Sequence, residues 1–462
     1  MERFDPQVKF NSELITKYNR NTPRYTSYPP ATQLTENFPV SEFHGAIARG
    51  NEQKLPLSLY FHLPFCQSAC YFCGCNVIVT QHKPVVEPYL DYLSRHIEAV
   101  APRLNRDRRV TQLHWGGGTP NYLEPHHVER LWEAIDRHFT FEDNAEISIE
   151  INPRYVDRNY ILLLKQFGFN RISFGIQDFN PKVQETINRV QPEQMLFQVM
   201  EWIREAGFES VNVDLIYGLP YQNLQTFTET IDKTLQLDPD RVAVFNFAYV
   251  PWMKPVQKNL PKDELPTASE KLDILQMTIE KLTGNGYQFI GMDHFAKDND
   301  ELAIAQRERQ LHRNFQGYTT KAGTAELFGF GLTSISMLDD VYVQNHKRLK
   351  DFYRAIDEGV LPIEKGYHLD RDDKIRRDVI MELMCHWTLY KKEMEERHHI
   401  DFDEYFDREL FDLQALATDG LVRLDSEKIE VTPVGRLLIR NIGFVFDAHT
   451  PEHNLERLSK AI

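Results

Sequence analysis

The chain of 462 residues has few long apolar runs, an excess of acidic over basic residues and few cysteines. No stretch of ~18 consecutive apolar residues occurs, which excludes a membrane-spanning helix. The first ten residues carry Glu, Asp and Lys and have no apolar h-region, so we expect no signal peptide and a cytoplasmic protein. Lys and Arg number 53 against 68 Asp and Glu. The net charge of −15 disfavours partners such as nucleic acid or anionic lipid.

Composition and length indicate a globular protein of several domains. Hydrophobic residues make up 42% and charged residues 26% of the chain, which excludes a mainly disordered, collagen-like or coiled-coil protein. At ~150 residues per domain the length allows about three units. The first part is polar and rich in proline, and its segment PRYTSYPP (residues 23–30) predicts an extended arm. We place the arm at 1–54, a barrel domain at 55–345 and a C-terminal domain at 346–462.

Short β-rich apolar runs alternate with amphipathic helical stretches along the middle of the chain. This alternation predicts βα units and a parallel sheet, hence an α/β protein whose functional loops lie at the carboxyl ends of the strands. The predicted strands are Leu57–Leu63, Val110–Trp115, Glu146–Ile151, Arg171–Gly175, Ser210–Ile216, Arg241–Phe247 and Tyr287–Met292. The predicted helices lie near 85–102, 125–139, 157–167, 192–206, 224–236 and 267–284.

The C-terminal part is charged and rich in helical sequence. Residues 416–440 predict a helix, two short strands around residues 425–428 and a further helix, which is the order of a winged-helix-like unit. Many such units bind DNA, but the acidic surroundings favour a structural or docking role.

Four of the five cysteines fall within ten residues, in Cys66-Gln-Ser-Ala-Cys70-Tyr-Phe-Cys73-Gly-Cys75, directly after the first predicted strand. In a reducing compartment this density indicates a metal or cluster site rather than disulfides. Three thiolates at the spacing C-x3-C-x2-C can hold three irons of a cubane cluster. The fourth iron then stays open to a chelate such as the amino and carboxylate groups of S-adenosylmethionine.

Two other interpretations of the cysteines remain open on spacing alone. A four-cysteine zinc site normally draws its ligands from two separated pairs, and a purely structural four-cysteine cluster would make Cys75 a ligand. We expect Cys75 to lie beside the cluster, because C-x-C has poor reach to a second cubane corner. The lone Cys385 is expected to be a small buried hydrophobic residue.

Several polar residues lie where they could serve a ligand at the strand ends. Tyr60 and His62 alternate on the first strand and therefore point the same way. The glycines of GGGTP (residues 116–120) permit close approach of a backbone to a ligand. Each of these features also has a structural explanation, as core residues or a tight turn. The segment Trp252-Met253-Lys254 falls in a loop with no assigned role.

The cysteine motif after a first strand resembles that of the radical S-adenosylmethionine superfamily. The longer run LYFHLPFCQSACYFCGC is similar to that of the oxygen-independent coproporphyrinogen III oxidase family, and the resemblance extends over nearly the whole chain. The motifs that carry it are PRYTSYP, WGGGTPNYL (115–123), EISIEINP (146–153), SFGIQDFN, NVDLIYGLP, FIGMDHFA and HRNFQGYTT (312–320).

The resemblance implies a partial (β/α)6 TIM-like barrel, a [4Fe-4S] cluster and two molecules of S-adenosylmethionine. It implies Tyr60, His62 and Glu150 as catalytic residues and Cys66, Cys70 and Cys73 as cluster ligands. The first cofactor molecule would contact Tyr60, Gly117, Glu150 and Ile335, and Phe72 would pack on an adenine. The second would contact Gly118, Thr119, Gln177, Arg189, Asp214 and Ala248.

The implied activity is the conversion of two propionates of coproporphyrinogen III to vinyl groups, giving protoporphyrinogen IX and carbon dioxide through a 5′-deoxyadenosyl radical. The implied partners are the substrate, an electron donor such as flavodoxin or ferredoxin, and an electron acceptor that no motif specifies. Arg24 and Arg313 are candidate cations for the substrate carboxylates. Nothing in the sequence demands a dimer, so we expect a monomer.

Three alternatives differ in class. A haem-binding chaperone related to the family would lack oxidase activity, but it is also expected to lack the arm and the fourth cysteine of the motif. A haem-opening radical methyltransferase would consume haem. A winged-helix regulator with a redox-sensing cluster would bind DNA, which the net charge disfavours.

Overall fold

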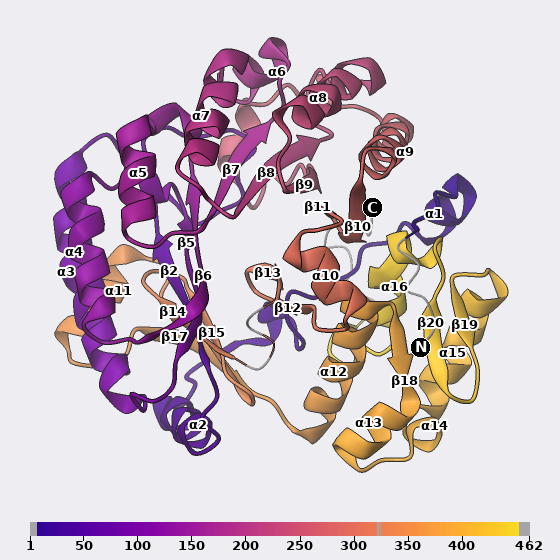
Figure 1. The fold of residues 1–462 in the computed structure, drawn as a ribbon. Coiled ribbons are helices and arrows are strands. Elements are labelled where there is room, and N and C mark those ends of the chain that lie inside the picture. Colours follow the sequence, from indigo (N-terminus) through magenta and orange to yellow (C-terminus); the bar gives the residue numbers. More distant parts are fainter. Residues whose placement is uncertain (1–6, 321–322, 324, 452–462) are drawn as a thin grey trace. The chain divides into compact units, whose positions relative to one another are not determined.

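The computed structural model describes residues 7–320, 323 and 325–451. The chain forms two compact units (Figure 1). The larger unit comprises Leu34–Ile274 and Thr324–His368, and the smaller comprises Met1–Gln33, Leu275–Gly323 and Leu369–Ile462. The division into three domains by residue range remains a prediction. Within the described ranges, no helix has both the length and the apolar character that crossing a membrane requires.

The larger unit is built on a mostly parallel sheet, which confirms the α/β class. Its strands follow the order β1-β17-β16-β15-β14-β2-β5-β6-β7-β8-β9. The run from β2 to β9 is parallel and in chain order, as a series of βα units requires. These strands are β2 (Leu57–Leu63), β5 (Val110–Gly117), β6 (Phe141–Ile151), β7 (Arg171–Gln177), β8 (Ser210–Tyr217) and β9 (Arg241–Asn246).

Burial explains why these segments fold as strands and helices. All but one residue of β2 are buried, the pattern of a strand covered on both faces. Helix α3 buries Tyr89, Leu93 and Ile97 at helical spacing and exposes Asp91 and Arg95 between them. Helices line the outer side of the sheet (Figure 1). The predicted helices are α3 (Val86–Val100), α4 (Pro125–Asp136), α5 (Arg158–Gln166), α7 (Glu193–Glu205), α8 (Leu224–Leu237) and α9 (Ala268–Gly284), and a short α6 (Pro181–Thr186) follows β7.

The sheet continues beyond β2 through strands that the sequence pattern did not reveal. Strand β14 (Glu326–Phe330) pairs parallel with β2, with Gly329 opposite Tyr60. It leads into the antiparallel strands β15 (Ile335–Met337), β16 (Val341–Asn345) and β17 (Ile363–His368), with α11 (Leu349–Asp357) between the last two. A short strand, β1 (Thr35–Glu36), pairs with β17.

Two expectations are wrong in detail. The segment predicted as a seventh parallel strand is β10 (Tyr287–Gly291), which forms an antiparallel hairpin with β11 (His294–Lys297). The turn between them leaves no room for a helix. The region 1–54 is not irregular throughout, because α1 (Ser12–Tyr18) and α2 (Val40–Glu52) lie within it. Helix α2 is stabilised by its buried face of Phe43, Ala46 and Ile47.

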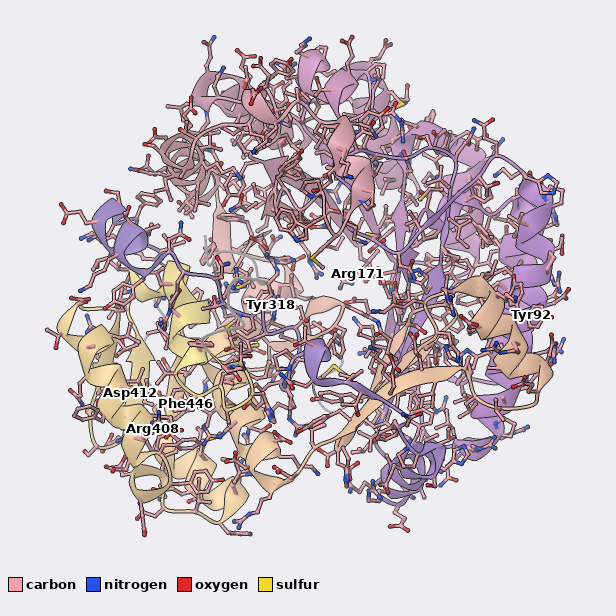
Figure 2. All side chains as sticks on the ribbon, turned by 180° about the vertical axis from the view of Figure 1, so that it is seen from behind. Tyr92, Arg171, Tyr318, Arg408, Asp412 and Phe446 are labelled. Carbon is pink, nitrogen blue, oxygen red and sulfur yellow. The ribbon has the colours of Figure 1, made fainter. Side chains whose placement is uncertain are left out.

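The smaller unit contains the winged-helix-like arrangement. Helix α15 (Asp407–Thr418) precedes the antiparallel strands β19 (Val422–Leu424) and β20 (Lys428–Val431), and α16 (Ile439–Phe444) follows. Strand β18 (Thr388–Tyr390) pairs with the other edge of β20. Figure 2 shows Tyr318 and Phe446 among the side chains of this unit. The remaining elements are α10 (Glu301–Arg307), β12 (His312–Asn314), β13 (Gly317–Thr319), α12 (Arg371–His386), α13 (Lys391–His398) and α14 (Phe402–Tyr405).

The described part of the predicted arm up to Gln33 belongs to the smaller unit. Tyr25 and Tyr28 are buried, and the Tyr25 hydroxyl donates to Asp447 Oδ2 at 2.9 Å. Arg440 Nε donates to the Pro23 carbonyl at 3.0 Å. Cys385 is 1% exposed and lies in an apolar cluster of this unit, as expected.

A buried carboxylate fixes the turn at the end of β7 in the larger unit. Asp178 is fully buried and follows Gln177, whose φ is +69°. Its Oδ1 accepts from Asn180 N at 2.6 Å and from Thr230 Oγ1 at 2.9 Å, and its Oδ2 accepts from Gln222 Nε2. The Gln222 amide cannot turn over, because its Oε1 also accepts from Leu219 N at 2.8 Å. Asp178 therefore ties β7 to α8 and to the loop after β8.

We expect Asp178→Asn to lower the free energy of unfolding by about 1–3 kcal/mol. The new amide group would replace an acceptor that faces three donors, so a buried donor loses its partner. Urea unfolding followed by circular dichroism measures the change. Glu185→Gln, at an exposed position of α6, is the control and should alter stability by less than about 0.5 kcal/mol. Equal stability of the two variants would contradict this role for Asp178.

Candidate active site

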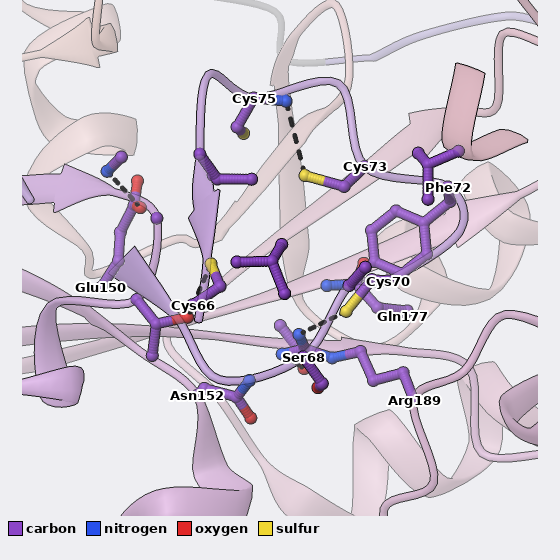
Figure 3. Close-up of a pocket in the computed structure, with 18 of the residues that line it drawn as sticks. Cys66, Ser68, Cys70, Phe72, Cys73, Cys75, Glu150, Asn152, Gln177 and Arg189 are labelled. Carbon is purple, nitrogen blue, oxygen red and sulfur yellow. Dashed lines mark hydrogen bonds between the residues drawn. The ribbon is translucent and has the colours of Figure 1, made fainter. Parts of the chain in front are cut away.

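A cavity of about 310 Å³ opens at the carboxyl ends of the parallel strands in the larger unit (Figure 3). This volume lies at the lower end of the range of small-molecule sites. The strands each end at this edge of the sheet, so residues far apart in sequence meet there. The predicted residues that line the cavity are Cys66, Cys70, Phe72, Cys73, Gly117, Gly118, Thr119, Glu150, Gln177, Arg189 and Asp214.

Cys66, Cys70 and Cys73 each lie close to a hydrogen-bond donor. Arg189 Nη1 donates to Cys70 Sγ at 3.5 Å, and Cys75 N donates to Cys73 Sγ at 3.4 Å (Figure 3). A hydrogen bond of 3.3 Å joins Cys66 Sγ to Thr119 Oγ1. Burial raises the pKa of Cys66 to about 11, whereas the hydrogen bond with Cys75 lowers the pKa of Cys73 to about 6. Donors of this kind stabilise sulfur that carries negative charge, as a thiolate ligand does.

The sequence motif and the shared cavity of the cysteines bear on which metal group they can hold. A tetrahedral zinc bound at ~2.3 Å by thiolates needs its sulfurs about 3.8 Å apart. Within the described residues, the one set of three ligand atoms found within 4.8 Å of one another is that of Glu87, His126 and His127, not the cysteines. Cys66, Cys70 and Cys73 line one cavity, and three thiolates at the spacing C-x3-C-x2-C can hold three irons of a cubane cluster.

Tyr60 and His62 lie one layer behind the cavity wall. His62 Nε2 lies 3.1 Å from the Asn76 carbonyl and must donate to it, so Nδ1 accepts from the Tyr60 hydroxyl at 3.1 Å. Burial lowers the pKa of His62 to about 4, which keeps the imidazole neutral at pH 7. The Tyr60 ring stacks on His114 with ring centroids 5.9 Å apart, and His114 in turn reaches Glu150.

Glu150 projects from β6 into the cavity. Its Oε2 accepts from Gly117 N at 3.3 Å, and its Oε1 lies 3.4 Å from His114 Nε2. Desolvation in the cavity opposes ionisation, but the hydrogen bonds from His114 and Gly117 prevail and lower the pKa of Glu150. Glu150 is therefore an anion that can accept from a hydroxyl pair or an ammonium group of a ligand.

The turn that contains Gly117 is possible only with glycine there. Its φ is +110°, and an added Cβ would lie 2.5 Å from the His62 ring. The glycine thus brings its backbone N–H to Glu150 while leaving room for His62. This geometry gives the GGGTP motif a role beyond a tight turn, since it forms one wall of the cavity.

A bulge in β7 turns Gln177 toward the cavity, and a hydrogen bond to the same strand holds Arg189 there. The pairing of β7 with β8 skips between Gly175 and Gln177, which turns the Gln177 side chain toward the cavity. Arg189 Nη2 donates to the Gly175 carbonyl at 2.9 Å, so the guanidinium is held against the same strand. On β8, Asn212 Nδ2 donates to Asp214 Oδ1 at 2.8 Å. Desolvation and the nearby charge of Glu150 raise the pKa of Asp214 to about 6.

The structure places the remaining predicted residues elsewhere. The Ala248 carbonyl accepts from Gln257 Nε2 at 3.2 Å, next to the cavity, and Ile335 lies on β15. Arg24 and Arg313 belong to the smaller unit, where Arg24 forms an ion pair with Asp293 and Arg313 Nε donates to the Tyr25 carbonyl at 3.2 Å. Both arginines therefore already have partners within that unit.

The cavity also contains residues that the sequence reasoning missed. Asn152 directly follows β6, and Ser173 lies within β7 opposite Glu150, so their positions beside predicted site residues were a usable signal. Ser68 lies between two cysteines of the motif. Lys254 comes from the loop after β9 and carried no local signal, because it approaches the cysteines only through folding.

Comparison with known proteins agrees with this geometry. Residues 60–234 match the model of the radical SAM superfamily, and residues 369–438 match the HemN C-terminal domain. An oxygen-independent coproporphyrinogen III oxidase from Synechocystis is 60% identical over 462 residues, 99% of each chain. The protein of the same name from Escherichia coli K12 is 48% identical over 457 residues, again 99% of each chain.

The fold of the chain is also similar to that of a solved structure. It is described as coproporphyrinogen III oxidase (HemN) from Escherichia coli, a radical SAM enzyme, and is 47% identical with a TM-score of 0.92. The match covers 96% of this chain and 100% of that one. This chain therefore belongs to the oxygen-independent coproporphyrinogen III oxidase family of radical SAM enzymes.

Proposed function

We propose that this chain converts two propionates of coproporphyrinogen III to vinyl groups, yielding protoporphyrinogen IX and carbon dioxide for haem and other tetrapyrroles. The observation that carries the proposal is the meeting of Cys66, Cys70 and Cys73 with Glu150 and Asp214 in one cavity. Relatives that match over nearly their full length bear the name of this activity. They favour an oxidase over a haem chaperone or a haem-opening methyltransferase.

The three cysteines would hold a [4Fe-4S] cluster at the cavity wall. When bound, the cluster supplies the electron that splits S-adenosylmethionine and so generates the 5′-deoxyadenosyl radical. Arg189 and Arg154 place positive charge near Cys70, since Arg154 Nη2 lies 3.9 Å from its sulfur. That charge stabilises a negatively charged cluster and its thiolates.

Glu150 and the Gly117 turn would orient the first cofactor molecule. Glu150 is anionic and half-exposed in the cavity, so it can accept from a ribose or an amino group. Phe72 presents an aromatic face in the same cavity, against which an adenine can stack. The second molecule would contact Gly118, Thr119, Gln177, Arg189 and Asp214, which line the cavity, together with Ala248.

Tyr60 and His62 would support the site from behind. His62 is neutral, and its two nitrogens are held by Asn76 and Tyr60. The Tyr60 ring stacks on His114, and His114 in turn reaches Glu150, so the pair supports Glu150 through that ring. We assign Tyr60 to the positioning of Glu150 and the first cofactor molecule.

The reaction requires partners besides the substrate. A reduced flavodoxin or ferredoxin would supply the electron for the cluster, and an acceptor must take the electron released with each carbon dioxide. A reducing cytoplasm is the compartment in which four neighbouring thiols stay available for iron. We infer a monomer as the working form.

The function is tested with protein reconstituted anaerobically with iron and sulfide. With dithionite, S-adenosylmethionine, coproporphyrinogen III and an added one-electron acceptor, we expect 5′-deoxyadenosine and protoporphyrinogen IX, identified by chromatography and mass. Cys66→Ser should lose both products, because one cluster ligand is gone. Formation of 5′-deoxyadenosine without vinyl product would contradict the proposed substrate, and tight haem binding without either product would favour the chaperone.

Cys75 offers a separate test of the ligand set. Cys75 N already donates to Cys73 Sγ, which places Cys75 beside the three ligands. We expect Cys75→Ser to retain the iron content and the absorbance near 400 nm of the reconstituted protein, whereas Cys70→Ser loses them. Cys385→Ser, in the smaller unit, should not change iron content. Loss of iron in Cys75→Ser would make Cys75 a ligand.

Cofactor affinity should depend on pH through Asp214. The pKa of this carboxyl is raised to about 6, so it is ionised at pH 7 and mostly protonated at pH 5. If the anion binds the cofactor, the KM for S-adenosylmethionine should rise about tenfold from pH 7 to pH 5. Asp214→Asn should have a raised KM with little dependence on pH. Asp263→Asn, at an exposed position, should keep the wild-type profile, and a wild-type profile in Asp214→Asn would contradict the assignment.

A further inference from the structure

The loop after β9 is joined to the cysteine loop by a buried glutamine. Gln257 is 2% exposed and lies on a short 3-10 helix, Pro255–Asn259. Its Nε2 donates to the carbonyls of Phe72 at 3.3 Å and Ala248 at 3.2 Å, while its Oε1 accepts from Val250 N at 2.6 Å. These bonds hold residues 248–257 in a fixed position at the rim of the cavity.

Lys254 places a cation at that rim. It lines the cavity, and its Nζ donates to the Cys75 carbonyl at 3.3 Å. Within the described residues, Lys254 forms no ion pair, and the neutral carbonyl is its one hydrogen-bond acceptor. Its charge also acts on the nearby Cys73 thiol, but no carboxylate of the described residues pairs with it, so the ammonium is available to a carboxylate ligand.

Two large apolar side chains adjoin this cation. Trp252 is 74% exposed and Met253 is 63% exposed, the two most exposed residues of their kind in the larger unit as described. Exposed apolar surface next to a cavity indicates a site that an apolar ligand covers. Pro255 and Val256 continue the apolar lining into the cavity itself.

Cation and apolar surface together match the chemistry of a reduced tetrapyrrole. Such a molecule has an apolar ring and carries carboxylates on short flexible arms. The chain has a net charge of −15, so a tetracarboxylate can bind only where cations are gathered. The methionine carboxylate of S-adenosylmethionine is another anion that Lys254 could pair with, but it would bring no apolar ring to Trp252 and Met253.

We infer that Lys254 and Trp252 form a substrate subsite at the rim of the cavity, where Lys254 pairs with a propionate and Trp252 packs against the adjoining pyrrole ring. The inference rests on the proposed function and assigns a role to the segment Trp252-Met253-Lys254. The subsite holds the tetrapyrrole in a fixed orientation beside the cofactor.

The test compares Lys254→Gln, Trp252→Ala and Lys254→Arg with wild-type holoenzyme. We expect Lys254→Gln to raise the KM for coproporphyrinogen III about tenfold, as loss of one charge-assisted hydrogen bond does. Lys254→Arg keeps the cation and should recover most of the affinity. Trp252→Ala should raise the same KM. In equilibrium titrations with coproporphyrin III, the stable oxidised analogue, the ligand should quench less tryptophan fluorescence in this variant than in the wild-type protein. Iron content and the KM for S-adenosylmethionine should not change.

Lys258→Gln is the matched control. Lys258 is exposed on the 3-10 helix that follows Lys254, and it does not line the cavity. It should behave as wild type. An unchanged KM and binding curve for the tetrapyrrole in both Lys254→Gln and Trp252→Ala would overturn the inference. A rise in the KM for S-adenosylmethionine alone would assign Lys254 to the cofactor carboxylate instead.

A third result would assign the surface to another partner. If the variants are slow with reduced flavodoxin but normal with dithionite, the loop is a docking site for the electron donor and the substrate subsite is wrong. If the wild-type enzyme forms vinyl product, the proposed function stands whichever result the variants give. The proposed function and the substrate subsite can therefore be refuted independently. If Lys254→Gln does not retain iron, Lys254→Arg and Trp252→Ala decide the question.

Discussion

The parallel course of β2, β5, β6, β7 and β8 is the constraint on which the site depends. Parallel strands in chain order bring their carboxyl ends to one edge, and the residues after each strand then share one volume. Cys66 follows β2, Gly117 ends β5 and Asp214 lies near the end of β8, although about 150 residues separate the first from the last. The backbone hydrogen bonds between these strands therefore bring a cluster site and several cofactor contacts around a single cavity, which no local motif can do.

Buried side-chain amides and carboxylates hold the loops of this edge. Asp178 and Gln222 fix the turn after β7, and Gln257 joins the loop after β9 to the cysteine loop. Such groups are costly to bury unless every polar atom has a partner, and with partners they allow one arrangement of the backbone. They explain how irregular segments stay ordered beside a cavity in which a reactive radical must be kept from water and oxygen.

The site gathers positive charge although the chain as a whole is acidic. The protein carries a net charge of −15, yet Arg154, Arg189 and Lys254 gather near the cysteines. Glu150 and Asp214 lie across the same cavity, and their pKa values shift in opposite directions because Glu150 has more donors. The cavity therefore offers cations to sulfur and carboxylate groups and anions to amino and hydroxyl groups, which are the polar groups of S-adenosylmethionine and of a carboxylated tetrapyrrole.

The sequence by itself determined the cysteine motif, the βα alternation and the strand-end residues, because these features depend on local spacing and on a period of two or 3.6 residues. The roles of Tyr60, Glu150 and Gln177 came from the resemblance to a known family, and all three residues lie on strands of the predicted sheet. The tertiary structure alone decided the antiparallel pairing of β10, the addition of β14 beside β2, and the approach of His114 to Glu150 and of Lys254 to Cys75. These contacts join residues far apart in the chain, and long-range pairing depends on packing and backbone hydrogen bonding that no short window of sequence contains.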